Sequence, residues 1–355
     1  MGNRTWRDAM HEALYGDDGF YHRPEGGPGH HFRTSSSASV QFARAVVGLL
    51  DIVDDALGRP DVIELVEVAA ARGALLTAVA GVVPEAAPHL LGRLRITGIE
   101  LAARPDALPA AIAWHASLAD RPPVRGLLLA NEWLDNVPLD VVIHTADGPR
   151  LLHVDNAGNE SPGGVPAAVD LQWLQDWWPS GETDDRAEIG LPRDQAWADA
   201  VERMAGGLAV AIDYGHVRTD RDAGAYAAGS LTGYRDGRQV APVPDGSCDI
   251  TAHVALDSVA AAGSAAAGAP ASLTDQRTAL RALGVSGGLP DRSLASADPR
   301  GYLQALQSAG QLAELTARGG LGDFGWVLQP VGLDPHFVKR LAAPHAPNPG
   351  SGLSQ

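Results

Sequence analysis

VIELVEVAAARG, residues 62–73, is the stretch that decides the fold of this chain. Its first seven residues are mostly apolar and β-branched, which is typical of a central parallel strand covered on both faces. The small residues that follow lead into ALLTAVAGVV, residues 74–83, which we expect to form a helix. At such a strand-to-helix turn a doubly wound α/β domain binds a nucleotide-like ligand, because the helix N-terminus presents free N–H groups.

The glycine pattern of this turn is incomplete. After such a strand we expect an acidic residue followed by Gly-x-Gly-x-Gly; Glu67 is present, but the glycine positions are Ala69, Ala71 and Gly73. A methyl group on a residue that needs positive φ, or that touches the ligand, costs roughly 1 kcal/mol or more. The sequence therefore predicts a weakened ligand site at this turn and does not exclude one.

Composition limits the classes of protein to consider. The 355 residues include 27 Lys and Arg against 43 Asp and Glu, and the net charge of −16 argues against an extended nucleic-acid surface. Cys248 is the single cysteine, which excludes an internal disulfide, and no Cys/His cluster has the spacing of a metal site. No apolar run has the length of a membrane span or signal peptide. We expect a cytoplasmic protein without membrane association, built as one elaborated α/β domain.

Polar residues follow two further predicted strands. The strand at 94–101 ends near Glu100, about as far from the turn as the ribose-binding carboxylate of dinucleotide folds, although a solvated glutamate is an alternative. The buried strand at 124–130 runs into Asn131 and Glu132. Open α/β sheets bind ligands at the carboxyl ends of their strands, so these residues are candidate site residues.

The remaining segments complete the predicted α/β order. We expect helices at 4–15, 38–57 and 103–113, strand-like alternation at 141–154, a buried strand at 207–215, a loop or lid at 229–235, an interrupted helix at 256–283 and a last strand at 324–330. Trp173, Trp177 and Trp178 are expected in the core or a subunit contact. His253 is interpreted as structural because no partner nucleophile is evident.

Several short motifs together carry a resemblance to a known family. They are Leu14-Tyr15-Gly16 with Gly19-Phe20-Tyr21, Phe32-Arg33-Thr34-Ser35, Asn131 to Pro138 (NEWLDNVP), Ile212-Asp213-Tyr214-Gly215, Gly229 to Tyr234 (GSLTGY) and Asp249 to Val254 (DITAHV). In this order, from about Met10 to Val331, the chain resembles the MidA-like family of class I S-adenosylmethionine-dependent methyltransferases. That family includes the mitochondrial complex I assembly factor that methylates a protein arginine.

The resemblance implies a mostly parallel, seven-stranded Rossmann-like sheet that binds S-adenosylmethionine at the ends of its first, second and fourth strands. The implied donor-binding residues are Glu67, Ala69, Ala71, Gly73, Glu100, Leu101 and Asn131, with Thr34 and Ser35 covering the donor. The implied catalytic residues are Asn131, Glu132 and Asp135, of which the two carboxylates would hold an arginine guanidinium. The family pattern after the acidic residue is Gly-x-Gly-Arg-Gly, and this chain keeps only the Arg72-Gly73 end.

The expected organisation is an N-terminal helix and site-covering arm at 1–44, a Rossmann-like core at 45–139 and 201–335, an inserted β/helical subdomain at 140–200 and a disordered tail at 336–355. Three functions remain open. The first is an active methyltransferase that acts on a protein; the second is a catalytically inactive relative that binds a protein partner. The third, a nicotinamide-dependent oxidoreductase, gives the Asn-Glu and Asp-Tyr-Gly motifs no role. A homodimer is compatible with the sequence, with the Trp-rich insertion as a candidate contact surface.

Overall fold

The computed structural model describes residues 4–22, 40–179, 181–285, 290–334 and 336–342. Its centre is a seven-stranded sheet in the order β16-β17-β10-β5-β2-β3-β4. The bounds are β2 (Ile63–Val68), β3 (Leu94–Ile99), β4 (Ile112–His115), β5 (Val124–Asn131), β10 (Met204–Asp213), β16 (Ser272–Asp275) and β17 (Gly325–Val331). Strand β17 is antiparallel to both neighbours, and the pairs from β10 to β4 are parallel. The predicted Rossmann-like α/β fold is confirmed.

Two glycines let the three central strands lie close together. A Cβ atom on Gly126 of β5 would lie 2.2 Å from the carbonyl oxygen of Glu64 on β2. A Cβ atom on Gly207 of β10 would lie 1.9 Å from the carbonyl oxygen of Gly126. Both glycines have positive φ, which other residues rarely adopt. The register of β2, β5 and β10, and hence the alignment of their carboxyl ends, depends on these two positions.

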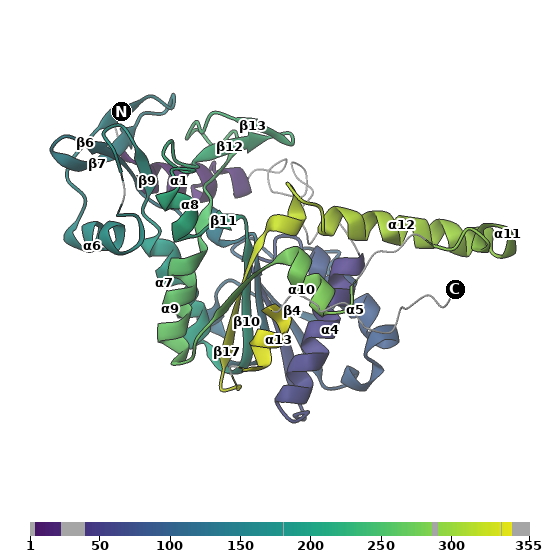
Figure 1. The fold of residues 1–355 in the computed structure, drawn as a ribbon. Coiled ribbons are helices and arrows are strands. Elements are labelled where there is room, and N and C mark those ends of the chain that lie inside the picture. The colour runs from purple at the N-terminus through teal and green to yellow at the C-terminus, as the bar shows by residue number, and fades with distance from the viewer. Residues whose placement is uncertain (1–3, 23–39, 180, 286–289, 335, 343–355) are drawn as a thin grey trace, which may run out of the picture.

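Helices cover both faces of the sheet (Figure 1). One face buries apolar side chains of α4 (Val40–Ala56), α5 (Ala74–Ala86), α10 (Gln276–Ala282) and α13 (His336–Ala342). The other face buries α7 (Leu191–Glu202) and α9 (Leu256–Ala267), with Trp197 fully enclosed. This two-sided cover explains why the strand at 62–68 is a nearly continuous apolar run.

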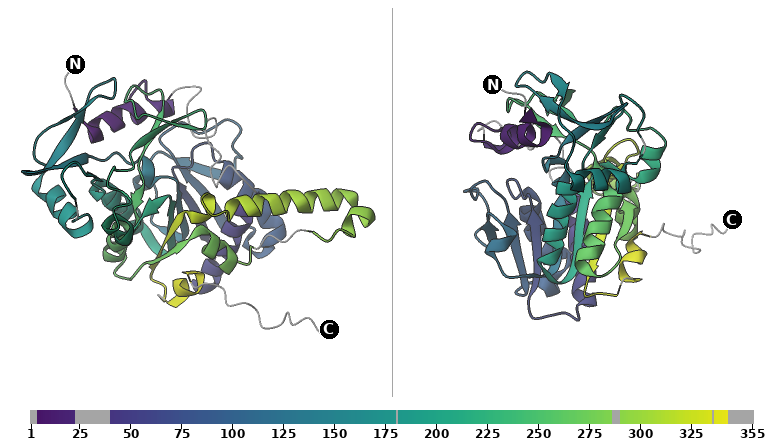
Figure 2. Two further views of the ribbon diagram at one scale, coloured as in Figure 1. Left: turned by 45° about the horizontal axis from the view of Figure 1, so that its top comes forward. Right: turned by 90° about the vertical axis from the view of Figure 1, so that its left-hand side faces the viewer.

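A second, smaller sheet lies beside α1 (Trp6–Tyr15) at the end of the core where β5 finishes (Figure 2). Its strands are β1 (Arg4–Thr5), β6 (Val141–Thr145), β7 (Gly148–Val154), β8 (Glu160–Pro162) and β9 (Arg186–Glu188). Trp6, Met10 and Leu14 of α1 are buried in one cluster with Val141 and Val154. Helix α6 (Ala168–Trp177) carries Trp173, which is buried together with Trp178. The tryptophans at 173 and 178 are therefore core residues and offer no contact surface.

Short elements complete the described chain. Strands β12 (Thr232–Arg235), β13 (Arg238–Val240) and β14 (Asp249–Thr251) form one small sheet, and β11 (Gly215–His216) pairs with β15 (Val254–Ala255). The short helices are α8 (Arg218–Asp222) and α11 (Leu294–Ala297), and α12 (Pro299–Leu315) is long. The 3₁₀ turns are η1 (Phe20–His22), η2 (Pro88–Leu90), η3 (Leu118–Asp120), η4 (Leu134–Asn136) and η5 (Leu321–Asp323).

The helix expected at 103–113 was wrong. Residues 102–111 form turns and irregular backbone, followed by β4 from Ile112. Pro105 and Pro109 lack the N–H groups that a helix interior needs. The Arg104 side chain stabilises the loop instead, because it donates hydrogen bonds to the carbonyl groups of Leu108 at 3.0 Å and Pro109 at 2.9 Å.

Three further expectations need correction. The helix expected over 256–283, with an interruption near 263–270, is two helices, α9 and α10, separated by the edge strand β16, which pairs with β17. The loop expected at 229–235 ends in β12, the middle strand of its small sheet. The tail expected to be disordered from 336 begins with α13, because Val338 and Leu341 bury their side chains in the core.

Candidate active site

The carboxyl ends of β2, β3 and β5 lie side by side at one edge of the sheet. Val68 of β2 is in register with Ile99 of β3 and with Ala130 of β5. The residues that follow these three positions therefore meet there. The predicted neighbours Glu67, the turn at 69–73, Glu100 and Asn131 are brought together, and their roles in binding stay predictions.

The turn after β2 keeps a left-handed backbone at both of its alanines. The φ angles are 55° at Ala69, 47° at Ala71 and 70° at Gly73. The Ala71 N–H donates a hydrogen bond to Glu100 Oε2 at 2.9 Å, and the Ala70 N–H donates to the Ile99 carbonyl at 3.1 Å. Left-handed alanine costs roughly 1–2 kcal/mol more than the right-handed form. The turn thus keeps a backbone conformation that favours glycine, although two of its three expected glycines are alanines.

Two buried oxygen atoms at this edge have no hydrogen-bond partner among the described residues. They are Glu67 Oε2 and Asn131 Oδ1. Burial, and next the nearby Glu100 carboxylate, raises the pKa of Glu67 to about 8. Asn131 Nδ2 donates to Glu132 Oε1 at 3.0 Å, and Glu132 itself has a φ of 52°. An unpaired buried oxygen is costly, so the two atoms fit a ligand that donates hydrogen bonds.

Apolar side chains lie beside Glu100, at the ends of β3 and β4. Leu101, directly after Glu100, is 66% exposed. The Trp114 ring packs so closely on β3 that a Cβ atom on Gly98 would lie 2.5 Å from it, and its Nε1 donates to the Ala102 carbonyl at 3.1 Å. An exposed leucine beside a ribose-type carboxylate fits a flat aromatic ligand group. Thr34 and Ser35, predicted to cover the donor, lie outside the described residues.

The carboxylate of Asp135, on η4, is held in place by hydrogen bonds from two side chains of the candidate site. Its Oδ2 atom accepts hydrogen bonds from the Tyr214 hydroxyl and from Thr251 Oγ1, the latter at 2.8 Å. Its Oδ1 atom is buried and has no partner among the described residues. One oxygen is therefore fixed by the protein, and a ligand that reached the other would give it the hydrogen-bond partner that it lacks.

Two more buried carboxylates surround Asp135 and position its neighbours. Asp213 Oδ2 accepts hydrogen bonds from the backbone N–H groups of Leu134 at 3.0 Å and Asp135 at 3.1 Å. Asp249 Oδ1 accepts one from Asn136 Nδ2 at 2.9 Å. Burial, and next the charge of Asp135, raises the pKa of Asp213 and of Asp249. Burial also raises the pKa of Asp135.

A buried guanidinium, that of Arg193 on α7, lies under this acidic group. It donates hydrogen bonds to the backbone carbonyls of Asp135 at 2.5 Å, Ala252 at 2.8 Å and Val137 at 3.2 Å. Burial lowers its pKa. Its donors thus hold the backbone of η4 against the segment after β14. Burial and mutual repulsion favour the neutral form of the surrounding carboxyl groups, and a cationic ligand would favour their charged form.

Tyrosines from the N-terminal segment close one side of the same group. The hydroxyl of Tyr21 lies 2.9 Å from Asn136 Oδ1, and that of Tyr15 donates to the Asn136 carbonyl at 3.1 Å. The two rings stack with centroids 5.5 Å apart. Burial raises the pKa of both hydroxyls, so they remain neutral. The N-terminal motif is therefore built into the site through its described part.

Sequence reasoning assigned no role to several residues that support Asp135. Four of them belong to the quoted motifs, and their positions at the ends of β10 and β14 could have indicated a role in the site: Asp213, Tyr214, Asp249 and Thr251. Arg193 gave no signal, because an isolated arginine on a helix is ordinarily solvated. His253, interpreted as structural, lies 3.0 Å through Nδ1 from the Tyr226 hydroxyl and packs against Tyr214.

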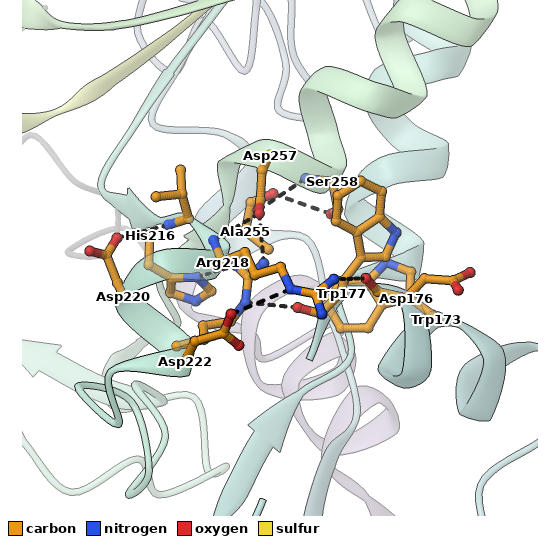
Figure 3. Close-up of polar contacts among 12 residues, drawn as sticks. Trp173, Asp176, Trp177, His216, Arg218, Asp220, Asp222, Ala255, Asp257 and Ser258 are labelled. Atoms are coloured by element: carbon orange, nitrogen blue, oxygen red, sulfur yellow. Dashed lines mark hydrogen bonds and ion pairs between the residues drawn. The ribbon is translucent and has the colours of Figure 1, made fainter. Parts of the chain in front are cut away.

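A second polar cluster joins α6, α8 and α9 (Figure 3). Asp257 Oδ2 accepts hydrogen bonds from the Arg218 N–H at 2.8 Å and from Arg221 Nη2 at 2.7 Å. Arg218 Nη1 also donates to the Asp176 carbonyl at 2.9 Å. Ser258 Oγ and Trp173 Nε1 both donate to Asp194. These contacts fasten the inserted helix α6 to α7 and α8, and α7 to α9.

The geometry can now be compared with known proteins. Residues 50–273 match the model of a family described as "putative S-adenosyl-L-methionine-dependent methyltransferase". The chain belongs to this family. It is the MidA-like family indicated by the sequence motifs, and its cofactor is S-adenosylmethionine. No protein with a curated description matches the chain.

Two solved structures share the fold of this family member over most of its length. The first is a COG1565 superfamily member from Burkholderia thailandensis bound to S-adenosyl-homocysteine, with 22% identity and a TM-score of 0.77 over 94% of this chain and 89% of that one. The second is a native structure of a COG1565 superfamily protein from the same organism, with 22% identity and a TM-score of 0.74 over 94% and 88%.

The described residues contain neither a membrane-spanning helix nor a group of metal ligands. None of the helices there combines the length and the apolar character needed to cross a membrane. Within the same residues, no three His, Cys, Asp or Glu side chains are grouped so that they could hold a metal ion.

Proposed function

We propose that the protein transfers a methyl group from S-adenosylmethionine to the guanidinium of an arginine side chain in another protein. The observation that carries this proposal is the buried acidic group of Asp135, Asp213 and Asp249, in which Asp135 Oδ1 has no partner among the described residues. The Arg193 guanidinium nearby is engaged with backbone carbonyls. A second, incoming guanidinium would supply the hydrogen bond that Asp135 Oδ1 lacks.

The donor side of the site fits the family's cofactor. S-adenosylmethionine supplies an electrophilic methyl group on a sulfonium. Glu67 Oε2 and Asn131 Oδ1 would accept hydrogen bonds from its ammonium group, and Glu100 would accept them from the ribose hydroxyls. The exposed Leu101 would cover one face of the adenine. This distribution supports binding at the ends of β2, β3 and β5.

The acceptor side would act by orientation. Asp135 Oδ1 would accept a hydrogen bond from one guanidinium N–H, while Tyr214 and Thr251 keep Oδ2 in place. Glu132, which follows β5 in a left-handed conformation, would bind a second N–H. Transfer would break the bond between the donor sulfur and its methyl carbon, form the bond from that carbon to the acceptor nitrogen and release S-adenosylhomocysteine. The carboxylate of Asp135 or Glu132 would take the proton that this nitrogen loses. Holding the acceptor nitrogen in line with the donor would contribute most of the rate.

A non-catalytic role in partner binding was the alternative function. It rests on the loss of two glycines from the turn after β2. The positive φ values at Ala69 and Ala71 instead favour a turn that still accommodates the donor. We therefore place the catalytic function first.

The test combines calorimetry with a methylation assay. Titration with S-adenosylmethionine and S-adenosylhomocysteine should give micromolar affinity in the unmodified protein and in Asp135→Asn. With tritiated donor, arginine-containing peptides should be labelled and matched lysine peptides should not. Asp135→Asn should lose at least about a hundredfold in rate, as expected when an orienting charge is removed.

The matched control is Asp147→Asn, which removes an exposed carboxylate of the insertion. It should leave rate and affinity unchanged. Binding without labelling of any arginine peptide or protein would contradict the arginine acceptor, and failure of either ligand to bind would contradict the donor site.

A further inference from the structure

Helix α12 stands away from the rest of the molecule. Figure 1 shows α12 projecting beyond the helices that cover the sheet, with α11 at its far end, and the left view of Figure 2 agrees. Of its residues, Leu315 at the base is the one that is buried. Among the described residues, α12 contacts chiefly α11, and α4 and η5 of the body. Most of its length therefore lacks a covering element in that part of the chain.

The composition of α12 does not suit a helix surrounded by water. From Gly301 to Ala313 the sequence is GYLQALQSAGQLA, which contains no charged residue. Leu303 is 66% exposed. Solvent-exposed helices ordinarily carry charged faces and i,i+4 ion pairs, and an isolated helix of this length is marginal in water. The pattern is typical of a helix whose exposed side is covered in the working protein.

The apolar and small residues of α12 follow the spacing of a helix-packing seam. Tyr302, Leu306, Ala309 and Ala313 recur at intervals of four, three and four residues. On the neighbouring exposed side, Leu303, Gln307 and Gly310 recur at four and three. A Cβ atom on Gly310 would meet nothing within 4 Å, so this side is open to close approach by another helix.

We propose that α12 is a dimerisation arm that packs antiparallel against α12 of a second copy of this chain. The charge distribution favours this partner. Each copy carries a net charge of −16, so two copies repel over most of their surfaces, and the uncharged length of α12 is where they can approach without like-charge contact. A twofold arrangement uses the same surface on both copies.

The dimensions suit such a contact. A helix of this length spans about 25 Å. Two of them packed along their length, each with its α11 alongside, provide roughly the 1,000 Å² that the smaller specific interfaces bury. Gln307 is the middle residue of Pro299–Leu315, so in an antiparallel pair the Gln307 side chains of the two copies lie next to each other. Glutamine side chains there can hydrogen-bond across the axis without adding charge.

The first experiment is sedimentation velocity on the full-length protein. We expect a dimer of the 36.9 kDa chain at micromolar concentration, and a monomer in the Leu303→Arg/Gly310→Arg double variant. The control is Val169→Arg on α6, because Val169 is 63% exposed, nearly as much as Leu303. It should remain dimeric. Unchanged circular dichroism and thermal midpoint in each variant will exclude unfolding as the cause.

The second experiment locates the contact. Cys248 is the single native cysteine and is buried, so an introduced cysteine is the main reactive thiol. A short bismaleimide should link Gln307→Cys into a dimer and should not link Val169→Cys. A monomeric unmodified protein, or a dimer that survives the double substitution and does not link through residue 307, would overturn the proposal. Neither experiment depends on methyl transfer.

Discussion

Replacing Ala69 and Ala71 by glycine should stabilise this protein, although such a change ordinarily destabilises a fold. Both alanines hold left-handed φ values of 55° and 47°. Glycine removes a strain of roughly 1–2 kcal/mol at each position. It also adds about 0.4–1 kcal/mol of conformational entropy to the unfolded chain. At the midpoints of these ranges the net gain is about 0.8 kcal/mol for each substitution.

The double variant Ala69→Gly/Ala71→Gly should therefore be more stable by about 1–2 kcal/mol. For a chain of this size, a change of that magnitude raises the thermal midpoint by about 2 °C. Differential scanning calorimetry on the donor-free proteins measures the shift. Titration with S-adenosylhomocysteine on the same samples should show binding at least as tight as in the unmodified protein.

Ala70 between the two positions provides the matched control. It is 4% exposed, packs in the core cluster and does not have positive φ. Ala70→Gly should therefore lose about 1 kcal/mol. If Ala69→Gly and Ala71→Gly destabilise the protein as much as Ala70→Gly does, the left-handed turn and the argument built on it are wrong.

Three further predictions concern the charged groups of the site. Tyr214→Phe should lower kcat about tenfold, since it removes one hydrogen bond to the Asp135 carboxylate, with donor affinity unchanged. Thr219→Val on exposed α8 is its control, and an equal loss of donor affinity would refute the assignment. Arg193→Lys should lower the free energy of unfolding by about 2–4 kcal/mol in urea titrations, because it loses several hydrogen bonds to buried carbonyls; a loss below 0.5 kcal/mol would contradict that role. Glu67 has a folded pKa of about 8, above its unfolded value, so its protonated form stabilises the donor-free protein and that contribution is lost as pH rises through 8. Unmodified protein should then lose about 1 kcal/mol more than Glu67→Gln between pH 7 and pH 9, and parallel pH profiles would contradict the shift.

The sequence predicted which residues meet at the ends of β2, β3 and β5, because its signals there are local; their role in donor binding stays a prediction. A strand of apolar residues followed by Glu67 and a turn, and polar residues directly after two more strands, place their side chains by chain direction alone. The register of β2 with β3 and β5 then brings Glu67, Glu100 and Asn131 together. Neighbouring parallel strands align their ends where the connecting loops are short. The proximity of these three residues could therefore be predicted without knowing any contact between distant segments.

The contacts that hold Asp135 could not be predicted in the same way, because they join distant segments. Arg193 reaches the Asp135 carbonyl across 58 positions and Thr251 reaches its carboxylate across 116. No periodicity or motif spacing encodes such pairs. The false helix at 103–113 has a different origin, since alanine content was weighed above the prolines at 105 and 109.

The residues that hold Asp135 lie far from it in the sequence and are synthesised after it. The strands that hold the donor edge, β2, β3 and β5, are complete once residue 131 has emerged. The groups that fix the Asp135 carboxylate and its backbone, Arg193, Tyr214 and Thr251, are synthesised up to 120 residues later. A chain that ends before these residues therefore lacks the contacts that hold the Asp135 carboxylate and its backbone. Those contacts are complete once Thr251 has been synthesised.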